Sequence, residues 1–94
     1  MRIEEQISKM AAAAFAKAFE RDVPPVVRKS QDEKHGDFQL NGVLPLAKQE
    51  KKNPRELAER VAALLVDAEA FERVEVAGPG FINLSLRPSW IAAQ

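Results

Sequence analysis

An aromatic ring and a carboxamide lie two residues apart near the C-terminal end of the chain, at Phe81 and Asn83. Residues 74–86 form two runs that alternate apolar and polar side chains, with Gly-Pro-Gly between them, which predicts two strands joined by a tight turn. Successive residues of a strand face opposite sides of a sheet, so Phe81 and Asn83 share one face and the aliphatic residues share the other. If the aliphatic face is the core, a nucleic-acid base could stack on Phe81 and hydrogen-bond to Asn83.

The same pattern also fits a purely structural role for this pair. An aromatic side chain on a sheet face can be buried under a loop or a neighbouring domain, and it then contributes packing rather than a stacking platform. The alternation alone therefore leaves both interpretations of Phe81 and Asn83 open.

Other side chains that could support catalysis or metal binding are few. His35 is the only histidine, which excludes multi-histidine metal sites, and the absence of cysteine excludes disulfides and cysteine-based zinc sites. His35 and the neighbouring acids Asp32, Glu33 and Asp37 fall in a polar, glycine-containing segment that is typical of a solvated turn. We therefore expect no catalytic residue and no metal in this chain.

A basic group at Lys48, Lys51, Lys52 and Arg55 is the second candidate contact to nucleic acid, through backbone phosphates. The alternative is a solvated junction between two helices. The chain carries 14 basic and 14 acidic residues and no net charge, which argues against a free-standing binder that attracts nucleic acid regardless of sequence. Gly-Pro-Gly is not a phosphate-binding loop, because a strand rather than a helix follows it.

Hydrophobic periodicity and Pro or Gly punctuation predict the elements that hold these residues. In order, they are a helix over 2–21, an extended segment over 26–29, a turn over 30–37, a strand over 37–40, a helix over 41–52, a helix from 54, the hairpin of 74–86 and a helix from 88. Asn53 followed by Pro54 is typical of a helix start. The buried stripe of that helix is predicted to comprise Leu57, Val61, Leu64, Leu65 and Ala68. In the short strand, Gln39 is predicted to lie outside the core.

Ninety-four residues are enough for one domain with a thin core. The N-terminus lacks a secretory pattern and no apolar run approaches the length of a membrane span, so we expect a soluble, cytoplasmic protein. The helix predicted from residue 88 has only one turn before the sequence stops, which is too short to be stable alone. We expect the chain to be the leading piece of a longer protein.

Four segments together resemble the N-terminal additional domain of arginyl-tRNA synthetases: GDFQLN at 36–41, LAK at 46–48, KNPRELA at 52–58 and VAGPGFIN at 76–83. The resemblance covers essentially the whole chain. It implies an α+β fold in two layers, with helices packed on one face of a small antiparallel sheet in the order α-β-β-α-α-β-β. It also implies that residues 1–87 form this domain and that 88–94 begin the connection to a catalytic domain absent from the sequence.

The resemblance implies binding of the D-loop at the outer corner of tRNA(Arg), with contacts to a D-loop base. In bacterial members of the family that base is typically adenine, and the matching residues here are Asn83, which would read it, and Phe81, on which it would stack. Gln39 is added because it is predicted to share their face. The parent would be an ATP- and Mg-dependent arginine–tRNA ligase of class I. Neither its HIGH-type nor its KMSKS-type ATP-site motif occurs here, so this piece should be non-catalytic and need no cofactor.

The partners implied are tRNA(Arg) and the other domains of the same enzyme. Binding to DNA or to a membrane is not expected. Two rival functions remain: a protein-interaction module whose exposed sheet face packs on another domain, and a small hydrolase or metal-dependent enzyme using His35.

Overall fold

The computed structural model describes residues 2–94, apart from the side chain of Glu33. The elements are α1 (Ile3–Phe19), β1 (Val27–Lys29), the 3-10 turn η1 (Glu33–His35), β2 (Phe38–Leu40), α2 (Val43–Glu50), α3 (Pro54–Leu65), β3 (Phe71–Ala77), β4 (Phe81–Leu86) and α4 (Pro88–Ala92). Their order confirms the predicted α+β arrangement, and α4 confirms the short helix predicted from residue 88.

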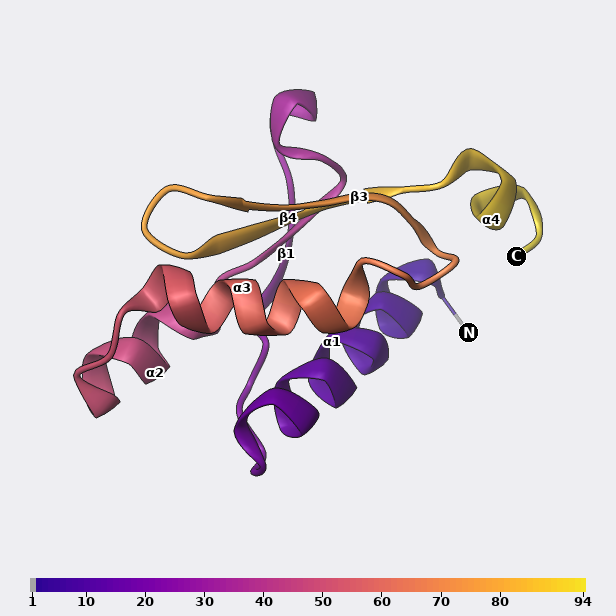
Figure 1. The fold of residues 1–94 in the computed structure, drawn as a ribbon. Helices are drawn as coiled ribbons and strands as arrows, with labels where there is room; N and C mark the ends of the chain where they lie inside the picture. The colour runs from indigo at the N-terminus through magenta and orange to yellow at the C-terminus, as the bar shows by residue number, and fades with distance from the viewer. Residues whose placement is uncertain (1) are drawn as a thin grey trace.

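The strands form one four-stranded sheet in the order β1-β2-β4-β3, and each neighbouring pair is antiparallel. Figure 1 shows α1, α2 and α3 on one side of this sheet and the loop that carries η1 on the other side. The predicted two-layer fold is confirmed. We call the face of the sheet opposite the helices the outer face.

The side-chain alternation predicted for the hairpin sets which residues enter the core. Ile82 and Leu84 of β4 are fully buried and Leu86 is nearly so, and in β2 both Phe38 and Leu40 are buried. Cross-strand pairing places Leu84 opposite Phe38 and Ile82 opposite Leu40, so one aliphatic surface spans the two central strands.

The helices cover that surface with their apolar stripes. The fully buried positions of α1 include Ile7 and Phe15, and α3 contributes Leu57, Val61 and Leu65. Leu64 was predicted to be buried, and this prediction is wrong, because the residue is 39% exposed. It faces a groove between α1 and α3 where the α1 wall includes short alanine side chains, which do not cover it.

Proline and asparagine determine where α2 and α3 begin. Helix α2 begins at Val43, so Pro45 falls in the first turn, where a missing backbone N–H breaks no helical bond. In α3, Pro54 is the first residue and the Asn53 side chain accepts a 2.9 Å hydrogen bond from the Arg55 N–H. The predicted start of this helix is confirmed. Within residues 2–94, no helix has the length and apolar character needed to cross a bilayer.

Candidate nucleic-acid interface

One row of side chains crosses the outer face from edge to edge. The register aligns Arg28 of β1 with Gln39 of β2, Gln39 with Asn83 of β4, and Asn83 with Glu75 of β3. We call these four residues the polar row. Directly opposed residues in antiparallel strands bring their Cβ atoms to about 4.5–5.5 Å, so each member can interact with the next.

The two central members of the polar row are joined by a hydrogen bond. Gln39 Nε2 donates to Asn83 Oδ1 at 2.9 Å. A carboxamide oxygen has two lone pairs and its nitrogen carries two protons, so this bond leaves Asn83 one acceptor position and both donors. The pair can therefore still offer adjacent donor and acceptor groups to a base edge.

Asn83 is less accessible than its position on the outer face suggested. Only 7% of its surface is exposed, so the prediction that its carboxamide is open to solvent is wrong. The prediction that it lies on the face opposite the core is confirmed. The physical reason is its place on a central strand. Longer side chains oppose it on both neighbouring strands, Gln39 on β2 and Glu75 on β3, and both can lie over the short amide. Gln39, at the more accessible end of the hydrogen bond, is half-buried.

Phe81 lies at the end of the same face, beside the hairpin turn. Its ring is half-buried, and a Cβ added to Gly78 would lie 3.3 Å from ring atom Cδ2. The turn itself is fixed to the start of α3: Arg55 donates to the Gly78 carbonyl at 2.7 Å, and a Cβ on Gly80 would lie 3.0 Å from Pro54 Cβ. These contacts hold the backbone that positions Phe81.

The loop before β2 is attached to β4 through Asp37. The Asp37 N–H donates to the Leu84 carbonyl at 2.7 Å, and Asp37 Oδ2 accepts from the Leu86 N–H at 2.7 Å. Gly36 permits this approach, because it has φ +80° and an added Cβ would lie 2.6 Å from the Leu84 oxygen. Asp37 thus has a structural role at the end of the outer face.

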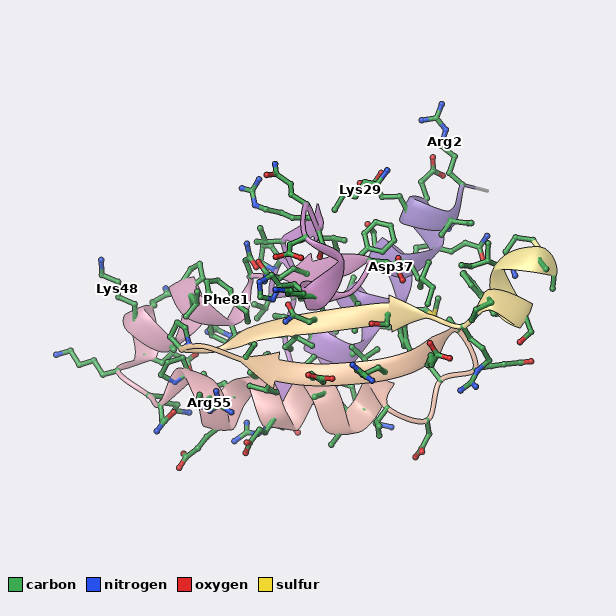
Figure 2. All side chains as sticks on the ribbon, turned by 90° about the horizontal axis from the view of Figure 1, so that it is seen from above. Arg2, Lys29, Asp37, Lys48, Arg55 and Phe81 are labelled. Carbon is green, nitrogen blue, oxygen red and sulfur yellow. The ribbon has the colours of Figure 1, made fainter. Side chains whose placement is uncertain are left out.

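The predicted phosphate contacts cluster where α2 ends and α3 begins. Figure 2 shows Lys48 and Arg55 toward the end of the molecule where Phe81 lies. Two of the four cations have partners within the chain: Arg55 binds the hairpin turn, and Lys52 lies 3.4 Å from a Glu50 carboxylate oxygen. Lys48 and Lys51 are exposed.

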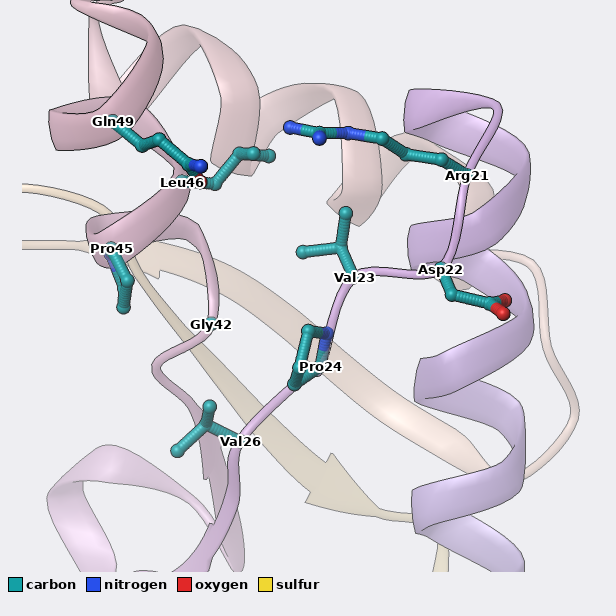
Figure 3. Close-up of a pocket in the computed structure, with 9 residues that line it drawn as sticks. All are labelled: Arg21, Asp22, Val23, Pro24, Val26, Gly42, Pro45, Leu46 and Gln49. Atoms are coloured by element: carbon teal, nitrogen blue, oxygen red, sulfur yellow. The ribbon is translucent and has the colours of Figure 1, made fainter.

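A separate apolar pocket of about 180 Å³ lies away from the polar row, between the segment after α1 and helix α2 (Figure 3). Val23, Pro24, Pro45 and Leu46 are among its lining residues, and an ion pair between Arg21 and Glu50 joins the same two segments. The pocket does not combine an aromatic platform with an amide. His35 is exposed, and no group of three or more His, Asp or Glu side chains among the described residues could hold a metal ion.

Reasoning from sequence missed two members of the polar row, Arg28 and Glu75. The short Gly-Pro-Gly turn could have revealed Glu75, because it pairs Ala77 with Phe81 and therefore Glu75 with Asn83. No comparable signal existed for Arg28, because the loop of residues 30–37 that joins β1 to β2 has no length-specific register.

The chain matches the family model described as "Arginyl tRNA synthetase N terminal domain" over residues 1–86. A curated relative from Chromobacterium violaceum named arginine–tRNA ligase is 46% identical over 94 residues, which cover 100% of this chain and 16% of the relative. One of the same name from Proteus mirabilis is 44% identical over 92 residues, 98% of this chain and 16% of the relative. The chain thus spans about a sixth of the relatives that it matches.

Two solved structures share the fold. Arginyl-tRNA synthetase from Plasmodium falciparum superposes with a TM-score of 0.87 at 20% identity, covering 97% of this chain and 17% of that one. The Thermus thermophilus enzyme gives a TM-score of 0.76 at 22% identity, covering 98% of this chain and 15% of that one. The family match spans nearly the whole sequence, and the chain belongs to the family of arginyl-tRNA synthetase N-terminal domains.

Proposed function

We propose that this domain recognises the D-loop at the outer corner of tRNA(Arg) on behalf of an ATP- and Mg-dependent arginine–tRNA ligase of which it forms the N-terminal part. The base, an adenine, stacks on Phe81 and hydrogen-bonds to the carboxamides of Asn83 and Gln39. The observation that carries this proposal is the hydrogen bond between Gln39 of β2 and Asn83 of β4 on the outer face, since β4 also begins with the half-buried Phe81.

The geometry supports selection of adenine over other bases. Adenine presents a donor at N6 next to an acceptor at N7, and a carboxamide matches both at once. Asn83 keeps a free acceptor position and its two Nδ2 protons beside the bond from Gln39. Because Asn83 is 7% exposed, the base reaches it by displacing the exposed Glu75 side chain, while Gln39 keeps its hydrogen bond to Asn83 Oδ1.

The free energies of the proposed contacts are large enough to discriminate between bases but too small for this domain to hold the tRNA alone. Stacking contributes about 1–3 kcal/mol and a bidentate amide contact about 1–3 kcal/mol. Association itself costs at least about 4 kcal/mol, so the isolated domain should bind tRNA only near the millimolar range. In the whole ligase the other domains hold the tRNA, and the same contacts act at high effective concentration. The zero net charge of the chain fits this division of roles.

Steady-state aminoacylation by the full-length ligase tests the proposal. Asn83→Ala and Phe81→Ala should each lower kcat/KM for tRNA by about 10- to 100-fold, from the contact energies above. Ser85→Ala is the matched control, since Ser85 lies on the same strand and face but outside the proposed contact. Circular dichroism verifies the fold of each variant. Wild-type kinetics in both folded test variants would refute the proposal and favour packing of this face on another domain.

A further inference from the structure

We propose that Arg28 binds the phosphodiester next to the base held by Gln39 and Asn83, so that the RNA backbone leaves the site across the β1 edge of the sheet. This inference rests on the proposed function and adds to it a phosphate subsite that is separate from the basic group at the α2–α3 junction.

Arg28 occupies the position that such a contact requires. It is the β1 member of the polar row, directly opposite Gln39, and its side chain is exposed. A pocket of about 270 Å³ lies between β1 and the η1 loop, and Arg28, Gln39, Ser30 and His35 are among its lining residues. A nucleotide bound at the amide pair would therefore have its backbone within reach of the guanidinium.

Arg28 also stands apart from most arginines of the chain because it has no internal partner. Five others are engaged: Arg21 pairs with Glu50, Arg55 donates to the Gly78 carbonyl, Arg60 lies over the Phe19 ring, Arg73 pairs with Glu75, and Arg87 donates to the Glu69 and Phe71 carbonyls. Among the described residues, the Arg28 side chain makes no hydrogen bond or ion pair, although its backbone pairs with Gln39 in the sheet. Its planar fork remains free for the bidentate contact that phosphate favours.

The distribution of charge at the two edges of the outer face also favours an RNA backbone that leaves across the β1 edge. On β3, the polar row ends in Glu75, which pairs with Arg73 at 3.1 Å. Arg73 is the only cation among the described residues of β3, so that strand offers a phosphate no unpaired cation. On the β1 side, the pocket is also lined by Lys29 and by Asp32, whose Oδ1 accepts from the Lys34 N–H at 2.9 Å. An anionic backbone is thus best accommodated over Arg28.

The test measures the affinity of the full-length ligase for tRNA(Arg) over a series of salt concentrations, with the natural D-loop base and with a substituted one. Arg28→Gln should weaken binding of both tRNAs by about tenfold. It should also flatten the plot of log affinity against log salt by about 0.7–0.9, and leave discrimination between the two tRNAs unchanged. Arg28→Lys should keep the slope. Lys9→Gln, which removes one exposed charge from α1, is the control and should change neither quantity.

The outcomes separate the two proposals. If Arg28→Gln keeps the wild-type slope, or alters base discrimination instead, the phosphate contact is refuted. If discrimination is lost in Asn83→Ala at the same time, the base-reading proposal still stands. If Asn83→Ala discriminates like the wild type, base reading fails whatever Arg28→Gln does.

Discussion

Removing the Gln39 amide should both destabilise the domain and weaken tRNA recognition. In Gln39→Leu the Asn83 Oδ1 loses the donor that lies 2.9 Å away, and with 7% of Asn83 exposed, water cannot replace it fully. Leaving a buried acceptor unpaired costs about 1–3 kcal/mol. For a domain of this size each kcal/mol corresponds to about 4–8 °C in Tm.

The double variant Gln39→Leu/Asn83→Leu distinguishes the two effects. Replacing both partners of a buried hydrogen bond by apolar groups is nearly neutral, so the double variant should recover most of the stability that Gln39→Leu loses. Its kcat/KM for tRNA should stay low, because no amide remains to read the base. Recovery of stability without recovery of activity is the expected signature.

Urea denaturation of the chain gives the stabilities, and aminoacylation by the full-length ligase gives the activities. Gln49→Leu, an exposed position on α2, is the matched control and should lie within about 0.5 kcal/mol of wild type. A structural role for the Gln39–Asn83 hydrogen bond is excluded if Gln39→Leu is no more destabilising than this control, or if the double variant loses the sum of the stabilities that the two single substitutions lose.

Substitutions at three further positions test the contacts that position the outer face, each by urea denaturation. Asn53→Ala removes the cap of α3 and should cost about 0.5–2 kcal/mol, whereas Asn53→Asp should retain most of it. Asp37→Ala leaves the Leu86 N–H without its acceptor and should lower the free energy of unfolding by about 1–3 kcal/mol. An unchanged urea midpoint would show that this hydrogen bond does not stabilise the fold. Gly42→Ala places a Cβ 2.1 Å from the Pro24 carbonyl oxygen and should cost at least about 1–3 kcal/mol, and a neutral result would contradict the close packing of these segments.

The parts of the fold that follow from local chemistry could be predicted from the sequence. Alternation in β4 correctly assigned Ile82 and Leu84 to the core, and Asn53 with Pro54 correctly marked the start of α3. These features depend on the alternation of side chains along a strand and on hydrogen bonds within one helical turn. They can therefore be predicted without knowing which elements become neighbours.

What could not be predicted depends on which strands become neighbours. The burial of Asn83 results from the residues opposite it on β2 and β3, and the exposure of Leu64 results from the short α1 side chains beside it. The place of Arg28 beside Gln39 requires the register across a loop that contains η1. Each of these features depends on contacts between residues of two different elements. The periodic pattern within one element carries no information about such contacts.

Base reading by Asn83 can be measured directly by a double-mutant cycle between protein and RNA in the full-length ligase. kcat/KM would be measured for wild type and Asn83→Ala, each with tRNA(Arg) carrying its natural D-loop adenine or a pyrimidine at that position. If Asn83 reads the base, the pyrimidine should lower wild-type activity strongly but leave Asn83→Ala almost unaffected, with a coupling energy of about 1–3 kcal/mol. Equal losses in both proteins, giving no coupling, would contradict base reading by Asn83.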